Sequence, residues 1–543
     1  MGQGGLTMRG VVACPQPWAA EVGAQVMEAG GNAFDAALAT AFMQWVWDPF
    51  MCGPGGMGVA QVWHAPTRQH KVVEFNARAG SKVRPEMWAG AATSRTEVSH
   101  LFVFDDWRNE LGHTSVMVPT SVAGLAEIHK RWATMPWAEL LQPAIRQARA
   151  GVPVHPTMLD WFHMPTPPGQ PTALQRIKAT PECARIFLRK DGSLPSFGEM
   201  LPMGSMADTL DALARQGPDE FYSGGFAKAM ADDIQRHGGF VTLDDLKGYK
   251  PRLHEPLTAA YREWRISTVR PPHAGFTALQ LFKLVEPFEL SRQRHGSADH
   301  LHILAAAMSL AHRDRLEHNA DPEFGPVPVE KVLDGARIRR QQQAIRDWSA
   351  STAAGGAEAG HTTNVCAADE QGNFVAITHT LGWASGAVTP GLGFVYNNSM
   401  NLADPRPGRP NTIAPGKARA SNMVPTLAFR GDVPFMAAGA LGGAVIISAV
   451  FQTMTNILDF GMSPTEAVSA PRAHCEGGRV FLEARTRSDV ADALERRGHV
   501  VQRDPFPFNP IMARAQVVLR RPDGAFDAGS DPRAGGGGVV FAA

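Results

Sequence analysis

Residues 361–381 read HTTNVCAADEQGNFVAITHTL, and this stretch decides the fold. Its first part, 361–369, is strand-like, while 374–380 alternates apolar and polar side chains. Because a short turn containing Gly and Asn, at 370–373, separates the two parts, the stretch predicts a β-hairpin. The first strand of this hairpin begins at a pair of threonines.

The segment directly before the hairpin has a different character. Residues 349–360 read SASTAAGGAEAG and contain no large apolar side chain, which is typical of a flexible linker. Such a linker would let the Thr362 hydroxyl attack the carbonyl of His361, and hydrolysis of the resulting ester would free the Thr362 amine. That amine has an ordinary pKa of roughly 7.7–8.0 and can serve as a general base. Taken alone, the pattern also fits an ordinary strand threonine.

Composition narrows the class of protein. The 543-residue chain is too long for one ordinary hydrophobic core, so several domains or one large layered domain are expected. Hydrophobic residues make up 44% and charged residues 19%, as in a globular enzyme. Lys+Arg and Asp+Glu both total 52, so there is no basic surplus to favour a nucleic-acid partner. A small substrate that is neutral or read by a few local charges fits better.

The lack of a recognisable secretory signal and the pattern of cysteines predict a cytoplasmic protein. Residues 1–23 lack the charged region and apolar run of a secretory signal, and no apolar run is long enough to span a membrane. The cysteines are odd in number, scattered and without a CxxC pair, which disfavours disulfides and zinc sites: Cys14, Cys52, Cys183, Cys366 and Cys475. We therefore expect a reducing compartment, no metal and no cofactor.

The rest of the chain predicts a mixed, layered α/β architecture. The Gly-rich turn at 52–58 lacks the ending of a phosphate loop and precedes a strand, so phosphate binding is disfavoured. Residues 137–340 read as mostly helical. The periodicities predict helices at 17–29, 121–132, 444–459, 463–470 and 488–497, and strands at 394–397, 425–429, 480–483 and 515–519.

Several motifs together resemble the γ-glutamyltransferase (γ-glutamyltranspeptidase) family. The hairpin stretch is similar to the start of the family's small subunit, with a TT pair, then D-x-x-G-N, then T-x-T-L. Other matching motifs occur in the family's order along nearly the whole chain: GVVACPQPWAAEVGAQVMEAGGNAFDAALATAF, VPTSVAGLAEIHKRW, LDDLKGYKP, PGLGFVYNNSM, the LGGA turn and GSDPRAGGGGV. The resemblance implies a four-layer αββα sandwich of the N-terminal nucleophile hydrolase type.

The resemblance also assigns roles to residues. It implies that cleavage between His361 and Thr362 turns a zymogen into a large subunit, 1–361, ending in the linker 349–361, and a small subunit, 362–543, which share one layered domain. Thr362 matches the nucleophile and Thr380 the hydroxyl that orients it. Gly442 and Gly443 match the glycines of the oxyanion hole, where backbone N–H groups need unobstructed access to developing charge. A tight turn before a helix is the alternative role for these glycines.

The expected substrate site departs from that of the transpeptidases. Asn76 stands where the resemblance places a carboxylate-binding arginine, and Arg78 follows two residues later, so Arg78 is expected to bind a substrate carboxylate. Without an acidic partner, a substrate ammonium would be buried at a cost of several kcal/mol. Gly382, Asn401-Leu402 and Ser421-Asn422 replace the amine-binding Asn, the Asp-Asp pair and the Ser-Ser pair. Further candidates that line or brace the pocket are Thr363, Asn373, Asn398, Ser421 and Asn422.

These departures resemble the acylase branch of the superfamily. We therefore expect a self-processing threonine amidohydrolase that cleaves a small amide carrying a carboxylate but no free α-amine. A true γ-glutamyltransferase or glutathione hydrolase is the first alternative, and a processing-dead scaffold or binding protein on the same fold is the second. The expected partners are a small amide substrate and the chain's own two fragments as a heterodimer, with further dimerisation left open and with neither nucleic acid nor membrane.

Overall fold

The threonine-led hairpin forms the centre of a seven-stranded sheet. In the computed structural model, which describes residues 8–96, 101–348, 361–533 and 537–543, β11 (His361–Asp369) pairs antiparallel with β12 (Phe374–Gly382). Every residue of β12 is buried, because both faces of the sheet are covered. The sheet has the order β20 (Gly538–Ala542), β1 (Gly10–Cys14), β11, β12, β2 (Met57–His64), β3 (Gln69–Phe75) and β8 (Arg252–His254).

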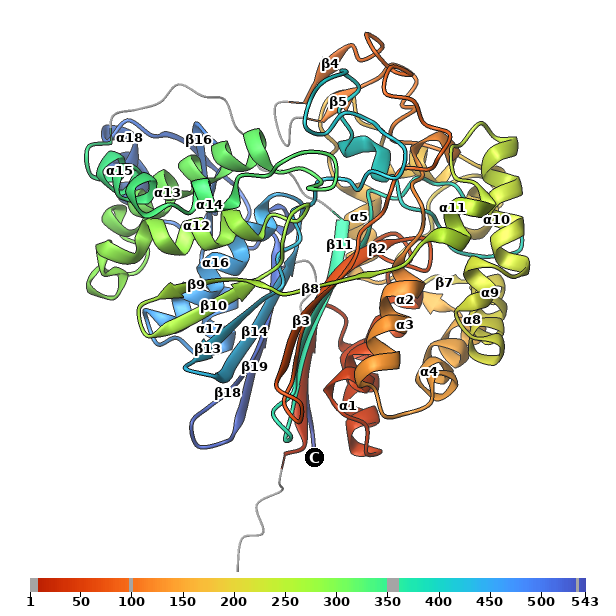
Figure 1. Ribbon diagram of the computed structural model, residues 1–543, viewed down its shortest axis with the longest axis horizontal. Helices are drawn as coiled ribbons and strands as arrows, with labels where there is room; N and C mark the ends of the chain where they lie inside the picture. The colour runs from red at the N-terminus through yellow and green to blue at the C-terminus, as the bar shows by residue number, and fades with distance from the viewer. Residues whose placement is uncertain (1–7, 97–100, 349–360, 534–536) are drawn as a thin grey trace, which may run out of the picture.

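A six-stranded sheet packs against the first one. Apolar side chains such as Trp63, Phe374, Phe429 and Val518 fill the space between the two sheets. Figure 1 shows the two sheets side by side in the middle of the molecule. The second sheet has the order β19 (Phe526–Ser530), β18 (Arg514–Arg520), β14 (Val433–Leu441), β13 (Thr426–Arg430), β10 (Trp264–Thr268) and β9 (Leu257–Tyr261).

Helices cover the outer face of each sheet, which completes the predicted αββα sandwich (Figure 1). On the seven-stranded side, α2 is buried over its whole length, because α1, α3 and α4 cover the surface that faces away from the sheet. The helices of this layer are α1 (Pro17–Glu28), α2 (Ala33–Trp47), α3 (Ser121–Trp132), α4 (Trp137–Ala150) and α8 (Gly204–Gln216). The other layer contains α12 (Gly275–Val285), α13 (Ala298–His318), α16 (Val445–Leu458) and α17 (Pro464–Ser469).

The remaining helices and strands complete the described structure. The helices are α5 (Pro156–His163), α6 (Ala173–Ile177), α7 (Pro181–Phe187), α9 (Asp219–Tyr222), α10 (Gly225–Arg236), α11 (Leu243–Gly248), α14 (Val329–Val332), α15 (Gly335–Arg346) and α18 (Ser488–Arg496). The strands are β4 (Ser94–Arg95), β5 (Phe102–Val103), β6 (Val152–Pro153), β7 (Met200–Leu201), β15 (Ala473–Cys475), β16 (Arg479–Leu482) and β17 (Val500–Arg503). Within the described part of the chain, no helix has the length and apolar character needed to cross a membrane.

The sequence predicted most of these elements and missed some. The strands expected at 425–429, 480–483 and 515–519 are confirmed as β13, β16 and β18. The strand expected at 394–397 is wrong: Tyr396 exchanges backbone hydrogen bonds with Ser385 and Ala387, but no ladder extends from them. Strands β9 and β10 lie inside the region that was expected to be mostly helical. The linker predicted at 349–360 lies outside the described residues.

The two parts of the chain on either side of that linker interleave in both sheets. In the seven-stranded sheet, β11 and β12 lie between β1 and β2, so strands from after the linker are flanked by strands from before it. In the six-stranded sheet, β13 pairs with β10 across the same division. A cut in the linker region would therefore leave two fragments held together by continuous sheet hydrogen bonding.

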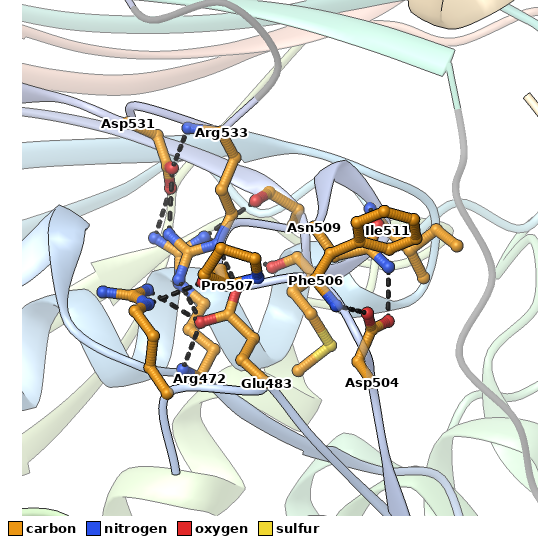
Figure 2. Close-up of polar contacts among 12 residues, drawn as sticks. Arg472, Glu483, Asp504, Phe506, Pro507, Asn509, Ile511, Asp531 and Arg533 are labelled. Atoms are coloured by element: carbon orange, nitrogen blue, oxygen red, sulfur yellow. Dashed lines mark hydrogen bonds and ion pairs between the residues drawn. The ribbon is translucent and has the colours of Figure 1, made fainter.

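A buried ion-pair cluster supports the turn that follows β14. The fully buried Arg533 contacts Glu483 at 2.6 Å and Asp531 at 2.9 Å, and Arg472 pairs with Asp531 at 2.5 Å (Figure 2). Arg472 also donates to the carbonyl of Ala513, 2.8 Å away. The backbone of Ala513 in turn packs against Gly442, so the cluster helps to fix the predicted oxyanion turn.

Neutralising Glu483 should destabilise the fold strongly. Glu483→Gln would leave Arg533 buried with one of its two carboxylate partners gone, and breaking a buried ion pair costs about 3–5 kcal/mol. We expect a large fall in the thermal unfolding midpoint, measured by calorimetry. Glu495→Gln, on the exposed surface of α18, is the matched control and should change the midpoint little. Equal midpoints for the two variants would contradict a stabilising role for the cluster.

Candidate active site

The threonine pair lies where the pairing of β11 and β12 becomes irregular. His361 pairs with Gly382 and Thr363 with His379, so three steps along β12 match two steps along β11. Such irregularities re-aim side chains and are common next to active sites. Thr362 faces a pocket, whereas Thr363 points to the opposite face of the sheet, as strand alternation requires.

The Thr362 hydroxyl is held by a second hydroxyl on the neighbouring strand. Thr362 Oγ1 donates to Thr380 Oγ1 at 3.2 Å, and the backbone N–H of Gly382 donates to the same Thr380 oxygen at 2.8 Å. Thr362 is only 5% exposed. The arrangement fixes the rotamer of Thr362 and aims its hydroxyl, as a nucleophile requires.

Both hydroxyls open into a small pocket of about 60 Å³. A larger groove of about 460 Å³ adjoins this pocket, and four residues line both of them: Leu101, Asn401, Leu402 and Asn422. The remaining residues that line the small pocket are Thr362, Thr380, Gly382, Trp383, Arg419, Ser421, Met423, Gly443 and Ile446. Among the residues that the structure describes, this lining contains one cation and no carboxylate.

The glycine turn lies beside the hydroxyl pair. Gly442 and Gly443 connect β14 to the start of α16 and both have positive φ, +134° and +62°. A Cβ at Gly442 would lie 2.8 Å from Ala513 Cα, so a side chain does not fit there. Gly443 lines the pocket with Thr362. Backbone N–H groups at the N-terminus of a helix are suited to stabilising negative charge that develops nearby.

Arg78 is not placed where a substrate-binding role needs it. Its guanidinium lies within 3.3 Å of Asp321 and 3.0 Å of Glu323, and it donates to the carbonyl of Gly416 at 2.9 Å. It does not line either the small pocket or the groove. Because these carboxylates already neutralise its charge, the expectation that Arg78 receives a substrate carboxylate does not fit the structure.

Thr363 also lies away from the pocket. Its hydroxyl accepts a hydrogen bond from Gln44 Nε2 at 2.9 Å, on the side of the sheet that α2 covers. The side-chain oxygen of Gln44 contacts His379 Nε2 at 2.9 Å. The sequence hypothesis placed Thr363 in the substrate site, but the structure places it in a buried polar network that ties the strand pair to α2.

The other candidate residues divide between the pocket and its surroundings. Ser421 and Asn422 line the pocket, and Asn422 Oδ1 accepts from Arg315 at 2.8 Å. Asn398 is fully buried and does not line the pocket. Its side-chain oxygen accepts a hydrogen bond from the backbone N–H of Trp383 at 2.8 Å, and its side-chain nitrogen donates to Glu110 at 2.7 Å. Asn373 lies in the hairpin turn at the opposite end of β12, bonded to Asp369. It therefore braces the hairpin and not the pocket.

Sequence reasoning missed several residues of the pocket. Arg419 is the main one, since it supplies the pocket's cation, and Trp383 and Met423 form apolar walls. Asn401 lines both the pocket and the groove. Arg419 lies in a segment without regular secondary structure, where no periodicity shows which way a side chain points. A basic residue close to the Ser421-Asn422 motif was the available signal.

One histidine-containing cluster has the composition of a metal site but lies elsewhere. Potential ligand atoms of His113, Asp233 and His237 lie within 4.8 Å of one another. His113 Nε2 contacts Asp233 Oδ2 at 3.2 Å, and Thr389 donates to the same oxygen at 2.8 Å. Burial lowers the pKa of His113. These hydrogen bonds hold the side chains together, and none of the three residues lines the pocket of Thr362.

Acid should weaken the fold around β11 and β12 through His379. Burial lowers the pKa of His379 to about 3, well below its ordinary value of 6.5. Above pH 6.5 the ring is neutral in both the folded and unfolded states; below it, only the unfolded chain gains the proton. The contribution of His379 to the free energy of unfolding should therefore fall by about 1.4 kcal/mol per pH unit as the pH drops from 6.5 towards 3.

Thermal melting between pH 4.5 and 7.5 measures this effect. We expect His379→Asn to melt with a shallower dependence on pH than the unsubstituted protein. His163→Asn is the control, since His163 is exposed at the C-terminal end of α5. Parallel pH profiles for the unsubstituted protein and His379→Asn would contradict the buried neutral state of His379.

Comparison with known structures agrees with this arrangement. The crystal structure of cephalosporin acylase from Bacillus halodurans superposes with a TM-score of 0.86 at 29% sequence identity, over 98% of this chain and 96% of that one. The αββα sandwich, with a threonine-led strand at its centre, places the protein in the class of N-terminal nucleophile hydrolase folds.

Sequence comparison identifies the family within that class. The family model described as gamma-glutamyltranspeptidase matches residues 19–541. Acylase ACY 1 proenzyme from Pseudomonas sp. (strain SE83) is 33% identical over 98% of this chain and 94% of its own length. Glutathione hydrolase proenzyme from Bacillus subtilis (strain 168) is 29% identical over 98% and 91%. The chain belongs to the γ-glutamyltranspeptidase family, and it is an enzyme of the amide hydrolase and acyltransferase class.

Proposed function

We propose that this enzyme is a self-processing acylase whose nucleophile is Thr362, freed as a new N-terminus by cleavage after His361. The observation that supports it is the hydroxyl pair, Thr362 Oγ1 at 3.2 Å from Thr380 Oγ1, inside a pocket that Gly443 also lines. Relatives named as proenzymes fit cleavage of one chain into two subunits. The proposed subunits are 1–361 and 362–543, held together by their shared sheets.

Self-cleavage proceeds by an acyl shift. The Thr362 oxygen attacks the carbonyl carbon of His361, the C–N bond of the peptide breaks, and the hydroxyl proton passes to the departing Thr362 nitrogen. Water then hydrolyses the ester, which gives the carboxylate of His361 and a free Thr362 with its hydroxyl restored. Thr380 orients the attacking oxygen in this step.

Turnover of a substrate amide repeats the chemistry on a second carbonyl. The Thr362 amine accepts the hydroxyl proton while the oxygen bonds to the substrate's acyl carbon. The turn at Gly442 and Gly443 stabilises the oxyanion, and the proton then leaves with the departing amine. Water then attacks the acyl carbon and gives a proton to the Thr362 amine. The bond to the Thr362 oxygen breaks, and that oxygen takes the proton back as its hydroxyl is restored. Each cycle consumes one water and releases a carboxylic acid and an amine.

The preferred substrate is a small amide whose acyl part carries a carboxylate but no free α-amine. An ammonium group in the small pocket would meet Arg419 and no carboxylate among the described lining residues, which opposes binding of a γ-glutamyl group. The name of the 33% identical relative, an acylase, points the same way. γ-Glutamyl transfer, which the names of the glutathione hydrolases suggest, is the alternative.

A pair of chromogenic amides tests this choice. Glutaryl-p-nitroanilide and γ-glutamyl-p-nitroanilide have the same acyl chain and differ in the α-amine alone. We expect kcat/KM for the glutaryl compound to exceed that for the γ-glutamyl compound at least about tenfold. The reverse preference, together with acceleration by added dipeptide, would establish the transferase alternative. No turnover of either, with no labelling of Thr362 by an amide-directed covalent inhibitor, would favour a scaffold or binding protein.

The cysteines bear on the cellular location of the enzyme. We propose a reducing, cytoplasmic location, which the odd number and scattered spacing of the cysteines support; all five are unpaired and buried in the structure. The processed pair of fragments is the proposed functional unit. Fractionation of cells that express the full chain, with activity followed in each fraction, tests the location.

A further inference from the structure

Arg419 places a buried guanidinium nitrogen without a hydrogen-bond acceptor, among the described residues, in the pocket of Thr362. It lines the same pocket as Thr362, and its backbone is held in place by Asn76, whose side chain donates to the carbonyl of Arg419 at 2.7 Å. Its Nη1 atom is buried and has no hydrogen-bond partner among the described residues. Within the same part of the chain, no carboxylate lies within 4.0 Å of its guanidinium. A buried guanidinium nitrogen without an acceptor is costly, so a ligand that supplies one would bind favourably.

The acidic group that attracts Arg419 is shared with a second arginine. Glu110 attracts Arg419, but it already pairs with Arg176 at 2.9 Å and accepts a hydrogen bond from Asn398 at 2.7 Å. Two cations therefore share one buried carboxylate, and the pocket retains a positive charge. Burial lowers the pKa of Arg419 to about 9, so the guanidinium remains protonated at neutral pH.

Gly382 makes space for the guanidinium next to the nucleophile. A Cβ at this position would lie 3.3 Å from Arg419 Nη1 and 2.5 Å from Asn398 Oδ1, so a side chain would displace both groups. The backbone N–H of Gly382 also holds Thr380, the partner of Thr362. The cation and the nucleophile thus face one small pocket and are linked through a single residue.

We propose that Arg419 is the substrate-binding residue that receives a carboxylate on the acyl part of the amide. The acyl group would occupy the small pocket, with its carbonyl at Thr362 and its carboxylate at Arg419, and the departing amine would lie in the larger groove. A guanidinium suits this task because it can donate two parallel hydrogen bonds to one carboxylate. The assignment rests on the function proposed for Thr362, but carboxylate binding itself can be measured without turnover.

Glutaryl-p-nitroanilide and pentanoyl-p-nitroanilide, which differ in the terminal carboxylate, test the assignment. For Arg419→Gln we expect kcat/KM on the glutaryl compound to fall about 30- to 100-fold, mainly through KM, because a charge-assisted hydrogen bond is lost. Turnover of the pentanoyl compound should change less than about threefold. Arg419→Lys should recover part of the glutaryl activity, and Arg521→Gln, at an exposed position, controls for loss of a positive charge.

Calorimetric titration with glutarate and with pentanamide, which has no carboxylate, tests binding separately from turnover. If glutarate binds the unsubstituted protein and not Arg419→Gln, while pentanamide binds both proteins alike or neither, the carboxylate site stands even if no amide is hydrolysed. Equal loss of both anilide activities in Arg419→Gln, with normal self-cleavage, would overturn the assignment and leave the role of Thr362 intact. Glutarate binding that is unchanged in Arg419→Gln would overturn it as well.

Discussion

Thr362→Ala should abolish both cleavage of the chain and hydrolysis of amides. The substitution removes the only atom that the account allows to form the acyl–enzyme bond, so kcat should fall at least about 10⁴-fold, in line with the loss of other catalytic nucleophiles. The fold should survive, because Thr362 is a small side chain with its hydroxyl turned towards the pocket. Intact mass spectrometry and p-nitroaniline release measure the two effects.

Thr362→Ser tests whether the hydroxyl alone is sufficient for activity. Serine keeps the hydroxyl but loses the methyl group, so it should still cleave itself and turn over substrate, more slowly than threonine. Persistent self-cleavage in Thr362→Ala would assign the nucleophile to another residue. Failure of Thr362→Ser together with normal folding would show that the methyl group is needed to hold the hydroxyl in position.

Gly442→Ala should cost about 10²–10³-fold in kcat, the range seen when one oxyanion donor is removed. The new Cβ would lie 2.8 Å from Ala513 Cα, and φ of +134° is unfavourable for alanine, so the turn must move away from the hydroxyl pair. KM should change less than kcat, because the donors act on charge that develops after binding. Steady-state kinetics on purified, fully cleaved enzyme separates the two parameters.

Gly461→Ala provides the matched control. Gly461 also has positive φ, +64°, but a Cβ there meets nothing within 4 Å, so alanine should lower stability by about 1 kcal/mol without affecting kcat. If Gly442→Ala lost only as much activity as Gly461→Ala, the turn would be a structural feature before a helix and not an oxyanion hole.

The sequence predicted the features that depend on local pattern. The hairpin and a layered α/β architecture follow from alternation, turn residues and helical periodicity, whereas the four-layer sandwich and the glycine turn follow from the resemblance to the family; the structure contains all of them. Strand alternation also predicts that Thr363 lies on the face opposite Thr362, where its hydroxyl contacts Gln44. Asn373 is seven residues along β12 from Thr380, roughly 20 Å at the rise of a strand, which excludes a shared pocket.

The anion site could not be predicted in the same way. Arg78 and Arg419 lie in segments joined by a single bridge, between Arg78 and Ala418, and both are basic residues near predicted motifs. What separates them is their partners: Asp321 and Glu323 neutralise Arg78, while Arg419 faces the pocket. Those acidic residues are more than 240 positions away from Arg78 in the sequence, so only the tertiary structure shows which arginine is neutralised.

N-terminal sequencing of each band from a denaturing gel of freshly purified protein is the most direct test of the central claim. The account predicts two bands, one starting at the N-terminus of the chain and a smaller one starting Thr362-Thr363-Asn364. The Thr362→Ala variant should give one band. A single uncut band from the unsubstituted protein, stable on long incubation, would contradict Thr362 as a self-released nucleophile.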